Sequence, residues 1–137
     1  MALCAQGRIA LLRGEAARAV GHYRAVLARL RPGESRPDIC EAIEFLAWAL
    51  AADGQHATAA ARLLAFAERE RTDMGIVLPP IDHPHHERAM DTVRTAMEER
   101  AFAAAWAEGQ ALDMEGAMAL ALTEGKQDDR RPRTEDR

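Results

Sequence analysis

The chain has 137 residues, of which 48% are hydrophobic and only 4% aromatic, and its formal net charge is −4. Alanine, which has the highest helix propensity and lets helices approach closely, occurs 30 times. Residues that favour strands are scarce, so the composition predicts an all-α domain. Arginines are interspersed with carboxylates, which argues against direct nucleic-acid binding. No apolar run approaches the ~20 residues of a membrane span, and no signal peptide opens the chain, so we expect a cytoplasmic protein.

The first two predicted helices span residues 2–13 and 15–31. Gly14 separates them, and Pro32-Gly33 ends the second. Apolar residues surround much of the first helix, whereas the terminal repeat of a helical stack needs a polar outer face. We therefore expect either a neighbouring repeat packed on this helix or a homodimer formed through it. The residues concerned are Leu3, Cys4, Ile9, Leu11 and Leu12.

A second pair of helices follows the proline-containing loop 32–37. Asp38 and Glu41 have the spacing of a capping box, which predicts that the third helix starts at Asp38. This helix ends at Asp53-Gly54, and a fourth runs from about residue 56 to 73. Apolar residues in both helices recur at the i, i+3, i+4, i+7 spacing of a buried helix face. They include Ile43, Leu46, Ala47 and Leu50 in the third helix and Ala59, Leu63, Phe66 and Ala67 in the fourth.

The two pairs of helices are related by an internal repeat. Gly14 and Gly54 occupy the same place in each pair and lie 40 residues apart, a period typical of stacked helical hairpins. The pattern of small residues, turn glycine and large apolar residue resembles the tetratricopeptide repeat. This resemblance implies two antiparallel hairpins over residues 1–74, stacked as a solenoid. The aligned pairs are Gly7 with Ala47, Ala19 with Ala59, Tyr23 with Leu63, and Leu27 with Ala67.

The pattern changes after Gly75. Asp82 or His83 can cap a helix over residues 84–97, with Pro84 in its first turn. Further helices are expected over residues 98–110 and after Asp113. Residues 75–124 therefore form a cap of three helices, which brings the total to about seven. Residues 125–137 carry charges of both signs without an apolar side chain, so they are predicted to be disordered.

This C-terminal region has a more specific likeness. The segments LPP at 78–80 and AFAAAWAEGQALDMEGAMALAL at 101–122 resemble the C-terminal end of bacterial ATP-dependent transcription regulators of the LuxR-type and antibiotic-regulatory, maltose-regulator-like families. Gly116 stands where those families usually carry Glu. The resemblance implies a module that binds a protein partner or a small-molecule inducer, connected to upstream domains of a longer regulator. A free-standing adaptor or scaffold protein is the alternative.

Tetratricopeptide geometry lines an inner groove with the first helix of each hairpin. The resemblance therefore assigns a partner or ligand groove to Arg8, Leu12, Glu41, Glu44 and Trp48. Two interpretations of Trp48 stay open, since the side chain either faces the groove between carboxylates or packs on a neighbouring helix.

No sequence pattern predicts an enzyme or a cofactor. The phosphate-binding patterns GxxxxGK[ST] and GxGxxG are absent, and His22 and His56 each lack the third member of a catalytic triad. Residues 82–87, DHPHHE, contain metal-ligand types, and His83 and Glu87 would share a helix face if the helix began early enough to include His83. They also suit a solvated first turn, and no distant His or Cys completes a ligand set, so a metal-binding protein is kept only as an alternative.

Two further interpretations concern single side chains. Phe102 and Trp106 lie four residues apart and are predicted to pair in the core. Cys4 and Cys40 lack the spacing of a disulfide scaffold or zinc site, so free thiols are expected.

Overall fold

The computed structural model describes residues 5–31, 33 and 35–123. In these ranges the protein is all-α, with seven α-helices and no strand, as the composition predicts. The predicted disordered tail, 125–137, and the residues Leu3 and Cys4 lie outside the described residues. The helices are α1 (Ala5–Leu12), α2 (Ala16–Arg29), α3 (Arg36–Asp53), α4 (Ala57–Met74), the 3₁₀ helix η2 (Pro80–Asp82), α5 (His83–Ala96), α6 (Glu99–Gln110) and a last helix over 114–123.

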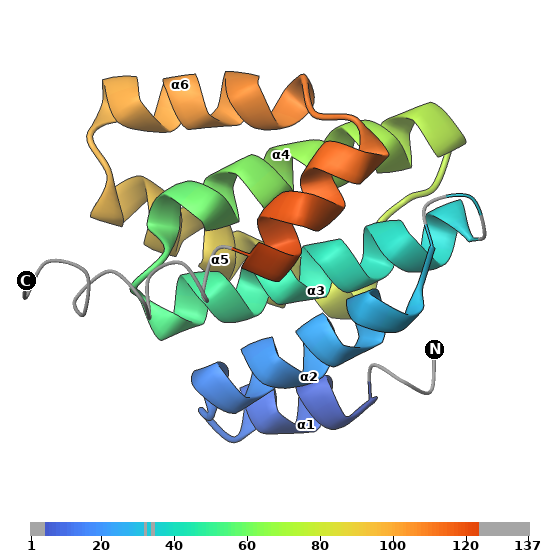
Figure 1. Ribbon diagram of the computed structural model, residues 1–137. Coiled ribbons are helices and arrows are strands. Elements are labelled where there is room, and N and C mark those ends of the chain that lie inside the picture. The colour runs from blue at the N-terminus through green and yellow to red at the C-terminus, as the bar shows by residue number, and fades with distance from the viewer. Residues whose placement is uncertain (1–4, 32, 34, 124–137) are drawn as a thin grey trace, which may run out of the picture.

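Successive helices pack on one another in chain order. Helix α1 packs on α2, α2 on α3, and α3 on α4, and Figure 1 shows them one above another. Helix α6 packs on α4, and α5 packs on both α3 and α4. The last helix crosses in front of these layers in Figure 1, where Arg24 of α2 donates a 2.9 Å hydrogen bond to the carbonyl oxygen of Ala121. Helices α3 and α4 therefore form the centre of the molecule.

Glycines at the predicted breaks end the helices as expected. Gly14 has φ +79°, Gly54 has φ +82° and Gly75 has φ +73°. This left-handed conformation is strained for residues with a Cβ, which is why glycine marks helix C-termini. The same turn chemistry thus recurs in the α1–α2 and α3–α4 pairs.

The third helix starts earlier than the capping-box spacing predicts. Ser35 is its N-cap, and Pro37 lies in the first turn. Proline is tolerated there because the first N–H groups of a helix have no intrahelical partner. The predicted start at Asp38 is therefore wrong. The cap predicted at Asp113 is confirmed, since its Oδ1 accepts a 2.7 Å hydrogen bond from the Gly116 N–H.

The aligned positions of the internal repeat are buried in both helix pairs. Tyr23 and Leu63 have no exposed surface, and a Cβ added to Gly7 would lie only 2.5 Å from the Tyr23 ring. A small residue in the first helix therefore lets the large residue of the second helix fit against it. The other aligned residues, Ala19, Leu27, Ala47, Ala59 and Ala67, are at most 2% exposed.

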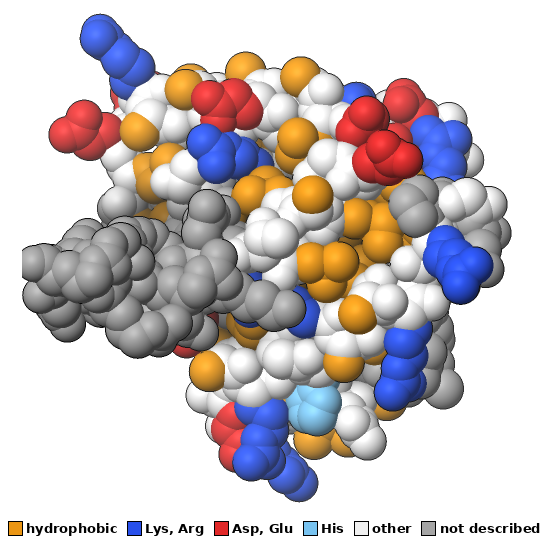
Figure 2. Space-filling view, in the orientation of Figure 1, with side chains coloured by type: hydrophobic (Ala, Val, Ile, Leu, Met, Phe, Trp, Pro, Cys, Tyr) orange, Lys and Arg blue, Asp and Glu red, His pale blue; other side chains and the backbone are white. Residues whose placement is uncertain are grey.

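The surface is mixed in character. Figure 2 shows hydrophobic side chains in the middle of one face, with arginines and carboxylates interspersed around its rim. Among the described helices, none is long and apolar enough to span a membrane.

Candidate functional site

Helix α5 packs along α3 on the side where the sequence predicts a groove. Trp48 of α3 is only 4% exposed. Its ring stacks on His85 of α5, with 5.8 Å between centroids and 25° between planes, and lies 4.9 Å from the Phe45 ring centroid. Trp48 thus packs on a neighbouring helix, which is the second of the two interpretations left open by the sequence.

Glu44, one turn before Trp48, is buried at a junction of three helices. Arg71 of α4 donates hydrogen bonds to both of its carboxylate oxygens, at 2.9 and 3.0 Å. His86 of α5 places Nδ1 3.6 Å from Glu44 Oε2. Burial raises the pKa of Glu44, and the Arg71 guanidinium partly offsets this rise. Since these contacts enclose the carboxylate, Glu44 serves the packing of α3, α4 and α5.

Arg8 ties α1 to the beginning of α5. Its guanidinium donates a 3.1 Å hydrogen bond to Asp82, the N-cap of α5, which is 4% exposed. The same guanidinium lies over the Phe45 ring, 5.0 Å from the centroid. This cation–π contact and the ion pair hold the N-terminal helix against both α3 and α5.

The structure separates the predicted groove residues into two places. Leu12 is 71% exposed and borders the same cavity as Trp48. Glu41 and Glu44 instead line a second cavity, of about 190 Å³, together with Cys40. Only part of the predicted groove is therefore a continuous surface.

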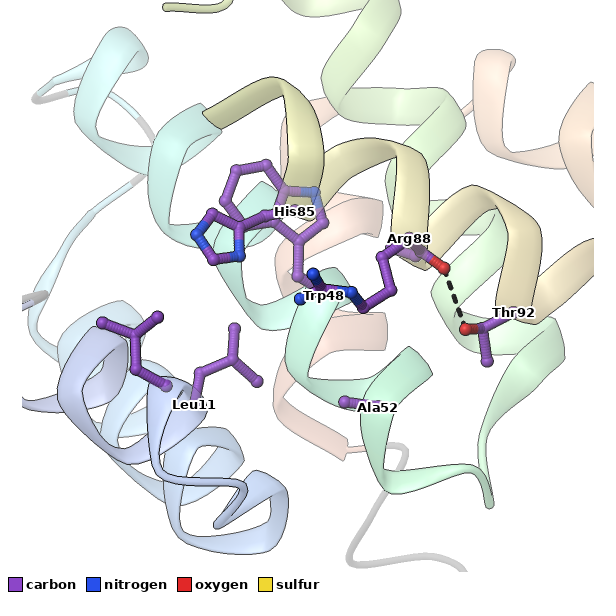
Figure 3. Close-up of a pocket in the computed structure, with 8 residues that line it drawn as sticks. Leu11, Trp48, Ala52, His85, Arg88 and Thr92 are labelled. Atoms are coloured by element: carbon purple, nitrogen blue, oxygen red, sulfur yellow. Dashed lines mark hydrogen bonds between the residues drawn. The ribbon is translucent and has the colours of Figure 1, made fainter. Parts of the chain in front are cut away.

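The cavity that contains Leu12 and Trp48 lies between α1, α3 and α5 and has a volume of about 220 Å³ (Figure 3). We call it the α1–α3–α5 cavity. Its walls are mainly apolar, and its polar groups come mostly from α5. It is lined by Leu11, Leu12, Trp48, Ala52, His85, Arg88, Ala89 and Thr92.

Two nitrogen-bearing groups at this cavity lack an acceptor among the described residues. The Trp48 indole Nε1 is buried and makes no hydrogen bond. The Arg88 side chain is exposed, and its guanidinium makes no ion pair or hydrogen bond in the described part of the chain. The Arg88 carbonyl accepts a 2.8 Å hydrogen bond from the Thr92 hydroxyl. Figure 3 shows the Arg88 side chain reaching back toward Trp48. The cavity therefore combines apolar walls with an exposed arginine at its edge that has no acidic partner among the described residues.

His85 and Arg88 were not among the groove residues predicted from the sequence, although His85 lies in the segment 82–87 that was considered for metal binding. They lie three residues apart on α5 and so share a helix face. That spacing is visible in the sequence, but it indicates a site only once α3 is known to pack on the same face.

The histidines of segment 82–87 contact different partners. His83 Nε2 lies 3.0 Å from the Leu78 carbonyl oxygen, whereas His85 stacks on Trp48 and His86 lies beside Glu44. Within the described ranges, no group of three or more His, Cys, Asp or Glu residues is placed to hold a metal ion. The segment instead contributes to the packing of α5.

Cys40 and the aromatic pair on α6 agree with the sequence interpretation. Cys40 is a buried free thiol whose Sγ lies 3.6 Å from the Ala67 carbonyl oxygen. Burial, with a smaller effect from Glu44, raises its pKa to about 12, so the unreactive thiol form is favoured. The Phe102 and Trp106 rings stack with 5.6 Å between centroids and pack against the core.

The chain was compared with known proteins once its geometry was established. No protein-family model, curated protein or solved structure matches the chain. The exposed apolar surface of α1 and the α1–α3–α5 cavity are therefore the features that bear on function.

Proposed function

We propose that this chain is a helical-repeat interaction module of a bacterial transcription regulator, which senses a protein partner or an inducer. The observation that carries the proposal is the apolar surface of α1, where Ile9 is 49% exposed and Leu12 is 71% exposed. In a stack of helical hairpins such a surface is covered by the next repeat or by a second copy of the chain. The likeness of segment 101–122 to regulator C-termini supports the regulator context.

The contacts of α1 suggest how binding is transmitted. Arg8 connects α1 to Asp82 at the start of α5, and α5 in turn packs on the centre of the molecule. A partner that binds only one arrangement of α1 and α5 will shift the population toward that arrangement. The proposed mechanism is therefore differential binding, without a chemical step.

The docking surface is tested by self-association, with the chain itself as the probe. We expect the wild-type chain to form dimers with rising concentration in size-exclusion chromatography with light scattering. Ile9→Glu should keep it monomeric, because a charge in an apolar contact is costly to bury. Val77→Glu is the matched control, since Val77 is 82% exposed in the segment between α4 and η2 and should not alter the association.

The outcomes separate the proposal from its alternatives. A wild-type chain that stays monomeric, with no change on Ile9→Glu, would mean that α1 presents no docking surface. A P-loop domain encoded upstream in the same reading frame would support the regulator context. A stop codon directly upstream would instead favour a free-standing adaptor.

A further inference from the structure

The α1–α3–α5 cavity has the size of a site for a small organic molecule. At about 220 Å³ it is larger than the roughly 150 Å³ apolar cavity that holds a benzene ring. It is smaller than the roughly 300–1,000 Å³ sites that bury drug-sized ligands. The volume therefore suits a single ring or a short alkyl chain with one polar group.

The lining determines which polar group fits. Leu11, Leu12, Ala52 and Ala89 provide aliphatic walls, and Trp48 provides an aromatic one. Among the described residues that line the cavity, Arg88 carries the charge and none is a carboxylate. Because the Arg88 guanidinium has no acidic partner in the described residues, an incoming anion can pair with it without displacing another carboxylate.

We propose that the α1–α3–α5 cavity binds a small carboxylic acid with an apolar body, whose carboxylate pairs with Arg88 while its body packs on Trp48 and the α1 leucines. Such a ligand contacts α1 and α5 at once, so it links the two helices that Arg8 and Asp82 also connect. The inference rests on the proposed sensing function, because it names the chemical class of the inducer.

The two tryptophans make binding directly observable. Trp48 lines the cavity, whereas Trp106 lies on α6 and does not line it. In ¹H–¹⁵N NMR spectra of the full chain, phenylacetate should shift the Trp48 indole signal saturably and leave the Trp106 signal in place. The Trp106→Phe variant assigns the two signals. Hexanoate, titrated in parallel, distinguishes an aromatic from an aliphatic body.

A neutral isostere of the ligand tests whether binding needs the negative charge of the carboxylate. Matched arginine variants test whether it needs the positive charge of Arg88. Phenylacetamide should bind at least about tenfold more weakly than phenylacetate, because it lacks the charge-assisted hydrogen bond. Arg88→Leu should weaken phenylacetate binding to a similar extent, and Arg88→Lys should restore part of it. Arg100→Leu, at an exposed position of α6, removes the same charge elsewhere and should leave binding unchanged.

Several results would overturn the inference. These are the absence of a saturable shift with both acids, equal binding of acid and amide, and unchanged binding in Arg88→Leu. A Trp48 shift that follows protein concentration without added acid would also overturn it, because a second copy would then fill the cavity.

The Ile9→Glu variant separates this inference from the proposed function, since Ile9 does not line the cavity. If the chain binds the acid but does not self-associate, the docking surface on α1 is contradicted and the cavity assignment is not. If the chain self-associates but does not bind the acid, the cavity assignment is contradicted and the docking surface is not.

Discussion

The Glu44–Arg71 ion pair joins α3 to α4 in the interior of the protein. The Glu44 side chain is 3% exposed and that of Arg71 15% exposed, so both charges are largely removed from water. Arg71→Met would leave a buried carboxylate with no guanidinium partner. We expect the free energy of unfolding to fall by about 3–5 kcal/mol, measured by urea denaturation.

Two further variants serve as controls for this loss. Arg62→Met breaks an ion pair with Glu108 whose side chains are 33% and 56% exposed, and it should cost less than about 1 kcal/mol. Adding Glu44→Gln to Arg71→Met should recover part of the lost stability, because it removes the unpaired charge. If Arg71→Met cost no more than Arg62→Met, the pair would not stabilise the junction.

At the scale of elements, α6 packs closely against α4 where Gly109 faces Arg62 and Ala65. A Cβ added to Gly109 would overlap the Arg62 carbonyl oxygen and lie 2.8 Å from the Ala65 Cβ. Because backbone atoms cannot move aside cheaply, Gly109→Ala should push α6 outward. We expect a loss of about 1–3 kcal/mol in the free energy of unfolding, determined by urea denaturation.

A glycine without this constraint provides the comparison. Gly21 lies on the exposed side of α2, and a Cβ there would meet nothing within 4 Å. Gly21→Ala should therefore stabilise the protein by about 0.5–1 kcal/mol, since alanine loses less backbone entropy in a helix. Equal effects of the two substitutions would show that the α4–α6 contact adapts to the extra methyl group.

The helix boundaries show what local patterns can predict. The breaks at Gly14, Gly54 and Gly75 were predictable because a left-handed turn depends on the glycine itself. The early start of α3 was missed, since proline is compatible both with a loop and with a first turn. The 3₁₀ helix η2 was missed as well, because Pro79 and Pro80 alone are typical of extended structure.

At the scale of the whole molecule, His86 makes stability depend on pH. It faces Glu44, Arg71, Glu68, Glu87 and His83 where α3, α4 and α5 meet. Burial, and next the Arg71 charge, lowers its pKa below the ordinary 6.5. The Glu68 and Glu87 carboxylates act in the opposite direction, but their effects on this pKa are smaller.

The direction of the pH effect follows from this lowered pKa. The unfolded chain takes up a proton at higher pH than the folded chain does. The contribution of His86 is therefore fully present above about pH 6.5 and is lost as the pH falls toward its folded pKa. The urea midpoint of the wild type should be lower at about pH 5.5 than at about pH 7.5. In His86→Gln this difference between the two midpoints should be smaller. His22→Gln, on α2, should retain the wild-type dependence, and a His86→Gln profile identical to wild type would contradict the assignment.

Much of the architecture could be predicted from the sequence alone. Alanine content and helix-period patterns indicated the all-α class, and the repeat aligned Tyr23 with Leu63 at positions that are both fully buried. These features were accessible because they depend on residues close in sequence, or on a pattern that occurs twice.

The tertiary structure decided which side chains form a site. Glu44 and Trp48 have the polar and aromatic character of a binding groove, yet α5 covers both of them. The partners of Glu44 are Arg71, 27 residues further along the chain, and His86 on another helix. Helix periodicity shows which residues share a face, but it does not show which helix packs on that face. For that reason the burial of Trp48, and its place beside Arg88 at one cavity, emerged only from the packing of α1, α3 and α5.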